Sequence, residues 1–298
     1  ATSVAAMRRA IDPELVPNGF AVPFYFYDYF MKANGLYDRI SQLMASSAFR
    51  DESQRPDILK AFRREIKDAP VPDQLRDQLD AMHKAFPPGT TPRCRSSANA
   101  EDMVGFNGAG LYNSYTHRLD EGHIEKSIKQ VWSSLWTHRA YQEREFYRID
   151  HLTSAMGVLV HPNFDDELVN GVALTRNVYF PDYEGYFINA QVGENLITNP
   201  EGNEAAEEIL VIKDLNVKNS RPYETIYIRR SDLVGPDESV ISQLDLMILI
   251  RQLKTIHDHF GELYDRSDDK TFAMDVEFKF DKAEKLAIKQ ARPWVIHI

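Results

Sequence analysis

The chain has 298 residues, 43% apolar and 27% charged, an ordinary globular composition that excludes a disordered, collagen-like or disulfide-stapled chain. Its 45 acidic and 35 basic residues give a net charge of −10, which makes nucleic acid or an anionic membrane a poor partner. The single cysteine, Cys94, excludes an internal disulfide and indicates a reducing, cytoplasmic compartment. The longest apolar run, Leu246–Ile250, is too short to span a bilayer.

The first 90 residues are predicted to be helical. An aromatic-rich helix over Phe24–Ala33 follows a proline and ends near Gly35, a typical helix stop. Two further helices, Pro56–Ile66 and Pro72–Phe86, each have a proline near their start. The run Pro87-Pro88-Gly89 then breaks the chain, and a segment rich in Gly, Ser and Asn extends from residue 93 to residue 110.

After residue 120 the chain is predicted to contain two long helices and a series of strands. The first long helix covers about Glu121–Tyr147, because apolar residues recur there at spacings of three and four. A second long helix is predicted over about Glu238–Leu263. Short apolar or β-branched runs predict strands over Met156–Val160, Gly171–Leu174, Tyr186–Ala190, Ile209–Ile212, Thr225–Ile228, Phe272–Phe280 and Lys285–Arg292.

This order of elements predicts an α+β protein with a helix-rich front half and a strand-rich back half. The length favours about two domains. We place their boundary at residue 160, giving 1–160 and 161–298, and expect a cleft between two lobes.

The last predicted hairpin holds the most informative local pattern. Strict alternation places Asp275, Glu277 and Lys279 on one face, opposite the apolar Met274, Val276, Phe278 and Phe280. Two carboxylates so spaced suit Mg²⁺, which takes one or two carboxylates plus substrate phosphates. On the next strand, Gln290 offers a neutral oxygen and Arg292 a planar fork that matches phosphate. The alternative is a half-exposed hairpin whose charges are solvated.

A second candidate phosphate contact lies in the segment from Arg93 to Asp102. An arginine that ends a strand before a loop rich in Ser, Asn and Gly can hold a phosphate chain, and the loop's backbone N–H groups can cup anions. The following Gly105–Gly110 run is glycine-rich but lacks the Lys-Ser/Thr ending of a P-loop. A plain flexible loop is the simpler interpretation of that run.

Other reactive or aromatic residues favour structural roles or, for the two histidines of the last long helix, structural or surface roles. His257 and His259 lie two apart on a predicted helix, so they face differently and are poor partners for one metal ion. His117 lacks the preceding glycine pair that would expose a phosphorylatable histidine. Trp132 and Trp136 fall one turn apart and are expected to pack in the core. Cys94 is expected to be a small buried residue.

Several blocks resemble the nucleotide-binding domain of the phosphoenolpyruvate synthase and pyruvate phosphate dikinase family. The Arg-Ser-Ser-Ala block from Arg95 and the Gln-Ala-Arg-Pro block from Gln290 are specific when found together at this separation. The resemblance spans about residues 14 to 294, with every block in order. The blocks are Val16–Val22, Arg95–Asp102, Gly108–Gly110, Val131–Trp136, Gly171–Asn177, Asn189–Glu194, Asp275–Phe278 and Gln290–Pro293.

The resemblance implies an ATP-grasp-like fold that binds ATP and Mg²⁺ between two subdomains. Residues 1–160 would form the N-terminal subdomain with its phosphate-binding loop, and residues 161–298 the C-terminal subdomain with the metal-binding hairpin. In such enzymes ATP phosphorylates a histidine on a separate swivelling domain, and a third domain passes the phosphoryl group to pyruvate. The implied partners are therefore ATP and those two domains of the same larger protein.

The resemblance also implies roles for single residues. Arg95 and Arg292 would hold the transferring phosphates and so act in catalysis. Glu277 and Gln290 would ligate Mg²⁺, with Asp275 beside them. These roles agree with the independent interpretation of the hairpin, because phosphoryl transfer needs positioning and charge neutralisation more than covalent chemistry.

For the nucleoside, the resemblance implies that Glu194 approaches the ribose and that Leu159-Val160-His161 forms the adenine-facing hinge. The sequence also departs from the family. The family's opening Gly-x-Lys lysine is missing, since Ala1–Met7 looks like the segment just after it, so we expect a fragment. Leu111–Ser114 replaces the usual Gln-Gln-Asp/Glu-Thr and is closer to the glucan water dikinase branch.

These departures leave alternatives open. The chain carries neither the swivelling histidine domain nor the pyruvate-binding barrel, so the sequence does not name the final acceptor. Another dikinase acting on a glucan or an antibiotic fits the same blocks. A non-catalytic module that senses nucleotide without turnover is the third reading.

Overall fold

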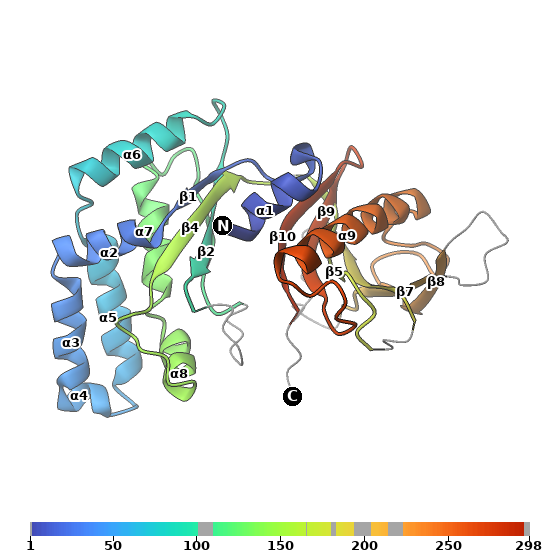
Figure 1. Cartoon of the computed structure of the whole chain (residues 1–298). Helices are drawn as coiled ribbons and strands as arrows, with labels where there is room; N and C mark the ends of the chain where they lie inside the picture. The colour runs from blue at the N-terminus through green and yellow to red at the C-terminus, as the bar shows by residue number, and fades with distance from the viewer. Residues whose placement is uncertain are drawn as a thin grey trace. The chain divides into compact units, whose positions relative to one another are not determined.

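The computed structural model describes residues 2–100, 110–164, 166–179, 183–193, 204–213 and 223–294. The chain divides into two compact units, which are described separately here (Figure 1). The first unit is Gly19–Asn163, and the second combines Thr2–Asn18 with the residues from Phe164 onward. A boundary at residue 160 groups Thr2–Asn18 with the front half, whereas these residues pack in the second unit. The predicted α+β class is confirmed.

The first unit is a four-stranded antiparallel sheet, ordered β1-β4-β2-β3, with helices α2 and α7 packed against it (Figure 1). The predicted helices near residues 24, 56 and 72 are confirmed as α2, α5 and α6. Its elements are β1 (Phe20–Val22), α2 (Phe24–Ala33), α3 (Leu36–Ala45), α4 (Ser47–Arg50), α5 (Arg55–Asp68), α6 (Asp73–Lys84), β2 (Pro92–Ala98), β3 (Tyr115–Thr116), α7 (Glu125–Ser134), α8 (His138–Phe146) and β4 (Met156–Pro162).

The core of the first unit is aromatic. Trp132 and Trp136 are fully buried, which confirms that they pack. The Trp136 Nε1 donates a hydrogen bond of 2.9 Å to the Tyr27 hydroxyl, and the Phe62 ring meets the Trp136 ring edge-on at 5.3 Å. Large buried rings of this kind contribute strongly to core stability, and the indole N–H needs a partner once it is buried.

The single long helix predicted over Glu121–Tyr147 is wrong. The structure has two helices, α7 and α8, separated at Leu135–Thr137. The Thr137 side chain caps α8 by accepting a hydrogen bond of 3.2 Å from the Ala140 N–H. Apolar periodicity did not reveal the break because Leu135 and Trp136 stay buried across it.

The second unit is a six-stranded antiparallel sheet, ordered β10-β9-β5-β6-β7-β8, with the long helix α9 on one face (Figure 1). All seven strands predicted from residue 156 onward are confirmed, the first as β4 of the first unit. The elements of the second unit are α1 (Thr2–Ala10), the 3₁₀-helix η1 (Pro13–Leu15), β5 (Glu167–Leu174), β6 (Gly185–Val192), β7 (Glu207–Lys213), β8 (Tyr223–Arg229), α9 (Gln243–Leu263), β9 (Met274–Asp281) and β10 (Leu286–Pro293).

The core of the second unit lies between the sheet and α9. The apolar residues of β9 are buried as predicted, and they pack with apolar residues of α9. Gly171 on β5 permits this packing, because a Cβ there would lie 2.1 Å from the buried Phe278 ring. The buried set includes Met274, Val276, Phe278, Phe280, Leu249, Leu253, Ile256 and Phe260.

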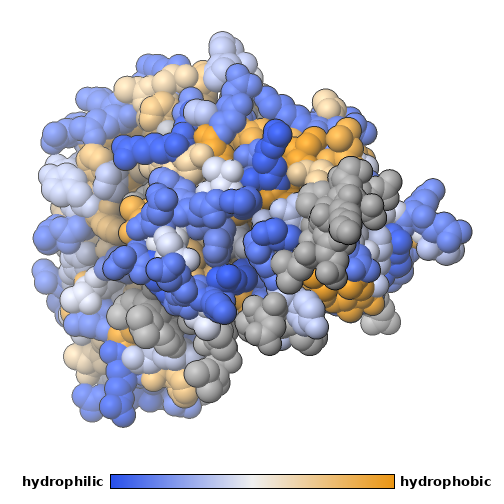
Figure 2. All heavy atoms as spheres, turned by 45° about the vertical axis from the view of Figure 1, so that its right-hand side comes forward, coloured by the Kyte–Doolittle hydropathy of each residue, from blue (hydrophilic) through white to orange (hydrophobic). Residues whose placement is uncertain are grey.

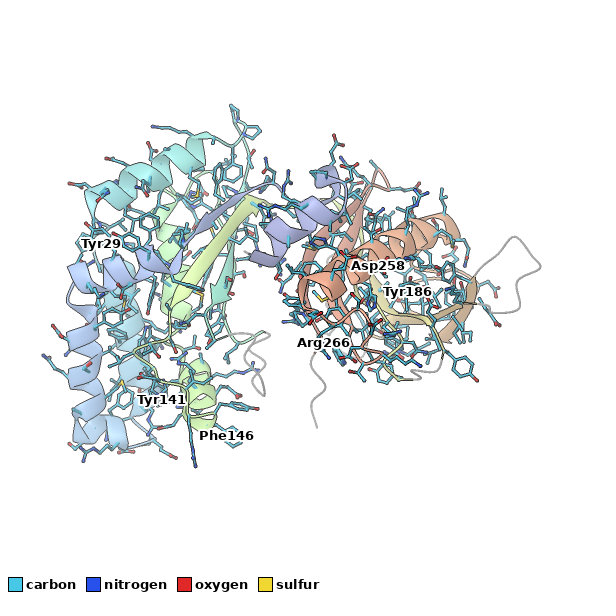
Figure 3. The ribbon with its side chains drawn as sticks, viewed as in Figure 1. Tyr29, Tyr141, Phe146, Tyr186, Asp258 and Arg266 are labelled. Carbon is cyan, nitrogen blue, oxygen red and sulfur yellow. The ribbon has the colours of Figure 1, made fainter. Side chains whose placement is uncertain are left out.

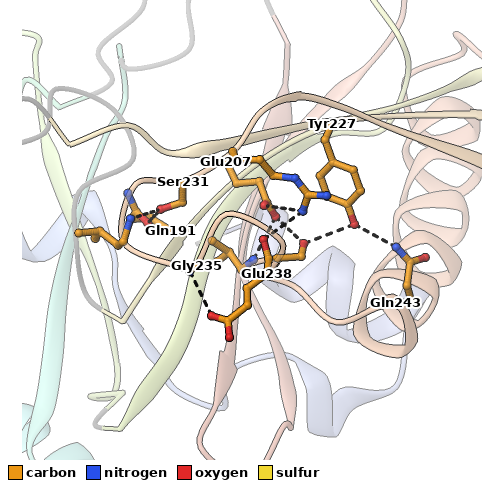
Figure 4. A network of polar contacts seen from close by, with 11 residues as sticks. Gln191, Glu207, Tyr227, Ser231, Gly235, Glu238 and Gln243 are labelled. Carbon is orange, nitrogen blue, oxygen red and sulfur yellow. Dashed lines mark hydrogen bonds and ion pairs between the residues drawn. The ribbon is translucent and has the colours of Figure 1, made fainter.

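A buried carboxylate fixes the segment before α9 (Figure 4). Glu207 on β7 is fully buried, and its Oε1 accepts hydrogen bonds from the Ser239 hydroxyl at 2.7 Å and the Val240 N–H at 3.1 Å. Arg230 lies 3.4 Å from the other oxygen and 3.5 Å from the centre of the Tyr227 ring. This network explains why α9 begins at Gln243 rather than near residue 238, with Ser242 as its cap.

The surface is mixed in character. Figure 2 shows hydrophilic side chains over most of one face, interrupted by smaller hydrophobic patches. Among the described residues, none of the helices combines the length and apolar character that a bilayer span requires.

Candidate functional site

The four hairpin residues predicted from sequence come together in two cross-strand pairs of the second unit. In the register of β9 and β10, Glu277 lies opposite Gln290 and Asp275 lies opposite Arg292. Directly opposed residues have Cβ atoms roughly 4.5–5.5 Å apart, so each pair can act on one ligand group. We call the side of the sheet that bears Asp275, Glu277 and Lys279 the charged face.

A β-bulge makes this pairing possible. Ile288 lies opposite the core residue Phe278, yet Gln290 lies opposite Glu277, so β10 holds one extra residue at Lys289. In a regular ladder Lys289 would stand opposite Glu277, and Gln290 would turn toward the core. The bulge therefore turns Gln290 and Arg292 to the charged face, a feature that alternation within one strand does not reveal.

Asp275 and Arg292 form a half-buried ion pair. The Nε and Nη2 atoms of Arg292 lie 3.0 Å and 2.9 Å from the Asp275 Oδ2. The Arg292 side chain is only 20% exposed, and the Asp275 side chain only 15%. Burial raises the pKa of the Asp275 carboxyl above its ordinary value, and Glu277 adds to that effect, although Arg292 opposes it. The alternative of solvated charges is therefore wrong for this pair.

Lys279 is more deeply buried than a solvated charge would be, at 3% exposed. Its ammonium nitrogen lies 4.0 Å from the centre of the Phe164 ring, within cation–π range. The neighbouring Lys289 pairs with Glu167 at 2.6 Å and lies 5.6 Å from the same ring. Sequence alternation placed Lys279 on the charged face but assigned it no role.

The donor set on the charged face fits Mg²⁺ carried with a substrate. Glu277 offers a carboxylate and Gln290 an amide oxygen from opposite positions. Within the described part of the chain, no group of three or more His, Cys, Asp or Glu side chains is placed to hold a metal ion. Mg²⁺ needs no such closed cage, because it commonly keeps waters and phosphate oxygens beside one or two carboxylates.

The same face is hollowed two strands away from these pairs, on β6 and β7. Cross-strand neighbours run from Glu277 through Val172 on β5 and Asn189 on β6 to Glu208 on β7. Asn189 and Glu208 line a hollow of about 390 Å³, whose other walls include Phe187, Leu210, Tyr179 and Ile228. Apolar walls with a few polar groups are typical of small-molecule sites.

In the first unit, Arg95 and Leu159 lie side by side. They are direct cross-strand partners on β2 and β4, while Cys94 and Val160 on the same strands are fully buried. Arg95 was expected at a strand end, but β2 continues to Ala98. Cys94 is a buried small residue as predicted, and burial raises the pKa of its thiol to about 12.

The predicted hinge residues differ in what they can offer. Val160 points into the core, and its backbone lies between β1 and β2, which both pair with β4 at this residue. His161 is 2% exposed, and its Nδ1 lies 2.7 Å from the Pro162 carbonyl oxygen, so Nδ1 carries the hydrogen. Glu194, the predicted ribose contact, lies outside the described residues, as do residues 101–109 of the predicted loop.

His117 is enclosed, in agreement with its predicted structural role. Its Nδ1 lies 2.9 Å from the Ser127 hydroxyl and its Nε2 lies 3.1 Å from the Gly122 carbonyl oxygen. With 2% of its surface exposed, it is not an accessible nucleophile.

His257 is not a surface residue. Its Nδ1 lies 3.0 Å from the Thr175 hydroxyl, which also accepts the Met274 N–H at 2.8 Å. Burial lowers the pKa of His257, and the nearby Arg176 lowers it further. The residue connects α9 to the end of β5. Of the two roles expected for it, structural or surface, it therefore has the structural one.

Sequence analysis missed one buried polar cluster in the first unit. Arg144 is fully buried, with its guanidinium 5.5 Å from the centre of the Trp136 ring, and its Nε donates to the His151 Nδ1 at 3.2 Å. His151 in turn stacks on Tyr141 of α8, with ring centres 4.0 Å apart. No pattern in the sequence marks these residues, because they meet only through the packing of α8.

A family model for the pyruvate phosphate dikinase AMP/ATP-binding domain matches residues 2–297. The chain belongs to this family. The resemblance drawn from the sequence blocks is thereby confirmed.

Relatives named as phosphoenolpyruvate synthases match across the chain. A probable phosphoenolpyruvate synthase of Staphylothermus marinus is 30% identical over 191 residues, 61% of this chain and 23% of that protein. One from Methanocaldococcus jannaschii is 27% identical over 297 residues, 93% of this chain and 24% of that protein. The phosphoenolpyruvate synthase of Pyrococcus furiosus is 24% identical over 285 residues, 87% of this chain and 33% of that protein. The chain thus spans a third or less of each of these relatives.

Proposed function

We propose that this chain is the ATP-binding domain of a multidomain dikinase of the phosphoenolpyruvate synthase and pyruvate phosphate dikinase type. The observation that carries the proposal is the cross-strand register on the charged face, which sets Glu277 opposite Gln290 and Asp275 opposite Arg292. The match over residues 2–297 supports it. In this proposal the domain phosphorylates a histidine on a separate swivelling domain, and a further domain delivers the phosphoryl group to pyruvate.

The fold belonging to this proposal is ATP-grasp-like. Its N-terminal subdomain corresponds to about residues 1–160 and its C-terminal subdomain to about 161–298. The two antiparallel sheets, one in each unit, support this assignment. The placement of Thr2–Asn18 in the second unit modifies the division at its N-terminal end.

The proposed chemistry depends on positioning and charge. Glu277 and Gln290 hold Mg²⁺, which neutralises phosphate charge when it is bound. Arg292 grips the transferring phosphates, and its ion pair with Asp275 fixes the guanidinium before the substrate arrives. Arg95 serves the same phosphates from β2. Such groups suffice because the protein contributes little covalent chemistry to phosphoryl transfer.

The nucleoside is proposed to meet the chain at other positions. The segment Leu159-Val160-His161 forms the adenine-facing hinge. Glu194 is the proposed ribose contact.

The metal assignment is tested by replacing Glu277 with Ala. ATP affinity is measured by calorimetry in the full-length protein, once with Mg²⁺ and once with EDTA. We expect Glu277→Ala to weaken ATP binding about tenfold or more in Mg²⁺, and to change it little in EDTA, since it removes one charged ligand. The matched control is Glu224→Ala, an exposed carboxylate on β8. An unchanged Mg²⁺ dependence in Glu277→Ala would refute the assignment.

The catalytic assignment is tested by Arg95→Lys and Arg292→Lys. A compact ammonium does not reproduce a bidentate guanidinium grip, so we expect phosphoryl transfer to fall about tenfold or more, from the loss of about 1.5–3 kcal/mol. Transfer is followed with labelled ATP in the full-length protein. Transfer near the wild-type rate in either variant would assign that arginine a structural role.

The acceptor assignment is tested with the isolated chain. Because His117 is enclosed, we expect no stable acid-labile label on the isolated chain after incubation with γ- or β-labelled ATP. Binding of ATP to the isolated chain should itself be measurable. Stoichiometric labelling of a histidine within the chain would contradict the need for a separate acceptor domain.

A further inference from the structure

Thr175 completes the ladder between β5 and β9 with its side chain. β5 ends at Leu174, whose cross-strand partner is Asp275. One residue further, the Thr175 N–H donates to the Met274 carbonyl oxygen at 2.9 Å, while the Met274 N–H donates to the Thr175 hydroxyl at 2.8 Å. In a regular antiparallel pair that second N–H would meet the carbonyl oxygen of Thr175. A side-chain hydroxyl therefore closes the ladder directly before Asp275.

The Thr175 hydroxyl is itself held by a second partner. Its oxygen lies 3.0 Å from the Nδ1 of His257 on α9, and Thr175 is 4% exposed. The hydroxyl thus joins the end of β5, the start of β9 and the helix α9. A buried hydroxyl with two polar partners has little freedom to move, because a partner left unsatisfied carries a free-energy cost. The backbone at Met274 is therefore fixed in place.

The residue after Met274 is the one that holds Arg292. The Asp275 Oδ2 accepts hydrogen bonds from the Nε and Nη2 of Arg292 at 3.0 Å and 2.9 Å. A shift of the β9 backbone at Met274 would move the Asp275 carboxylate and, with it, the guanidinium. A displacement of about 1 Å at a reacting centre can slow a reaction about a hundredfold, even when the change responsible lies elsewhere.

We propose that Thr175 is a positioning residue for phosphoryl transfer, which holds Asp275 so that its carboxylate sets the Arg292 guanidinium. This inference rests on the proposed function, which assigns the transferring phosphates to Arg292. Thr175 acts through the Met274 backbone and not through a contact of its own with the substrate. The proposed metal ligand Glu277 lies two residues beyond Asp275 on β9, so metal binding depends on Thr175 much less than transfer does.

The role predicts a fall in transfer rate without an equal fall in ATP affinity. Thr175→Val keeps a branched side chain but removes the acceptor for the Met274 N–H and the contact with His257. In the full-length protein with ATP and Mg²⁺, we expect phosphoryl transfer to fall about tenfold and ATP affinity to fall less than about twofold. Thr175→Ser keeps the hydroxyl and should restore most of the transfer rate.

A double-mutant cycle tests whether Thr175 acts through Asp275. Asp275→Ala removes the carboxylate on which the proposed effect depends. In that background Thr175→Val should change the transfer rate less than about twofold, because the ion pair with Arg292 is already lost. If the two losses multiply instead, Thr175 affects transfer by another route and the inference is overturned.

The matched control is Ser127→Ala. Ser127 of the first unit is fully buried, and its hydroxyl lies 2.9 Å from the Nδ1 of His117, a contact of the same kind as that between Thr175 and His257. Its removal should lower thermal stability and leave the transfer rate unchanged. If Thr175→Val does not fold, Thr175→Ala serves as a second variant, and thermal unfolding of each variant is followed alongside transfer.

The outcomes separate this inference from the proposed function. Transfer at the wild-type rate in a folded Thr175→Val variant overturns the positioning role, and so does a loss of ATP affinity that equals the loss of transfer. A Thr175→Ser variant as slow as Thr175→Val also overturns it, since the hydroxyl is the group that the role requires. A wild-type protein that transfers no phosphoryl group from ATP to a histidine would overturn the proposed function itself.

Discussion

The two units cover an antiparallel sheet in different ways. In the first unit helices pack on the sheet and build an aromatic core around Trp132 and Trp136. In the second unit one long helix, α9, and the short α1 pack with the sheet, and the core holds phenylalanine and aliphatic residues. The opposite side of the second sheet is the charged face. Its Asp275–Arg292 ion pair joins two strands in register rather than lying inside a helical core.

This difference shows where a polar group can be buried at a small cost in folding free energy. In the first unit Arg144 is buried behind α8 and is surrounded by rings. In the second unit Asp275 and Arg292 stand on alternating strand positions, where each has a cross-strand partner. Each position on a strand face has a cross-strand neighbour that can serve as a polar partner. A helical core has no such regular neighbour, so each buried polar group there needs its own partner.

The largest expected effect comes from breaking the aromatic core of the first unit. Trp136→Ala should lower the free energy of unfolding by about 3–5 kcal/mol, because it removes a fully buried ring and its hydrogen bond to Tyr27. Chemical denaturation with Trp132 fluorescence measures the loss. The matched control is Phe146→Ala on α8, whose side chain is 79% exposed (Figure 3). A loss below about 1 kcal/mol for Trp136→Ala would contradict a rigid aromatic core.

Overpacking the second unit should have the next largest effect. Gly171→Ala places a Cβ 2.1 Å from the Phe278 ring and 2.8 Å from the Asn189 carbonyl oxygen. We expect a loss of about 1–3 kcal/mol in denaturant titrations, because the ring is fully buried and has little room to move. Gly235→Ala is the control, since its nearest neighbour is the flexible Glu238 side chain at 3.2 Å.

A double variant checks the cause of that loss. Phe278→Leu should relieve part of the Gly171→Ala penalty, so the two changes together should cost less than their sum. Strict additivity would show that the loss arises elsewhere in β5.

A half-buried histidine of the first unit, His151, should make the stability of that unit depend on pH. Burial, aided by the Arg144 charge, lowers the pKa of His151 from 6.5 to about 4. Between these values the unfolded chain binds more protons, so stability falls as the pH drops from about 6.5 toward 4, on the order of 1–2 kcal/mol. Thermal unfolding across this range measures the slope.

One variant attributes the slope to a single residue. His151→Phe keeps a ring on Tyr141 and should flatten the profile between pH 6.5 and 4. A steep slope that persists in His151→Phe would assign the titration to other groups.

The smallest expected effects concern helix caps, and they should be equal in both units. Thr137→Ala on α8 and Ser242→Ala on α9 each remove a side-chain acceptor from an N-terminal N–H. Each should cost about 1 kcal/mol in denaturant titrations, because a cap acts locally whatever covers the sheet. Thr137→Ser keeps the acceptor and should cost less than half as much. A much larger loss for one cap would show that it also supports packing.

Sequence patterns predicted the second unit better than the first. Alternation on β9 separated the core residues from Asp275, Glu277 and Lys279, and burial confirms that separation for Asp275 and Glu277, whereas Lys279 is as buried as the apolar set. In the first unit the same kind of reasoning joined α7 and α8 into one helix, because an apolar period says nothing about a cap at Thr137. Strand pleating is a strict geometric rule, whereas helix ends depend on single side-chain hydrogen bonds.

The sequence by itself determined the α+β class, the strands of the second unit, the grouping of carboxylates on one side of β9, and the family. These follow from local geometry and from ordered motif blocks. The tertiary structure alone decided that the bulge at Lys289 brings Gln290 opposite Glu277, that Thr2–Asn18 joins the second unit, and that Lys279 lies over the Phe164 ring. Strand register, the placement of Thr2–Asn18 in the second unit and ring contacts all join residues that are far apart in the sequence. Only packing between elements therefore determines them.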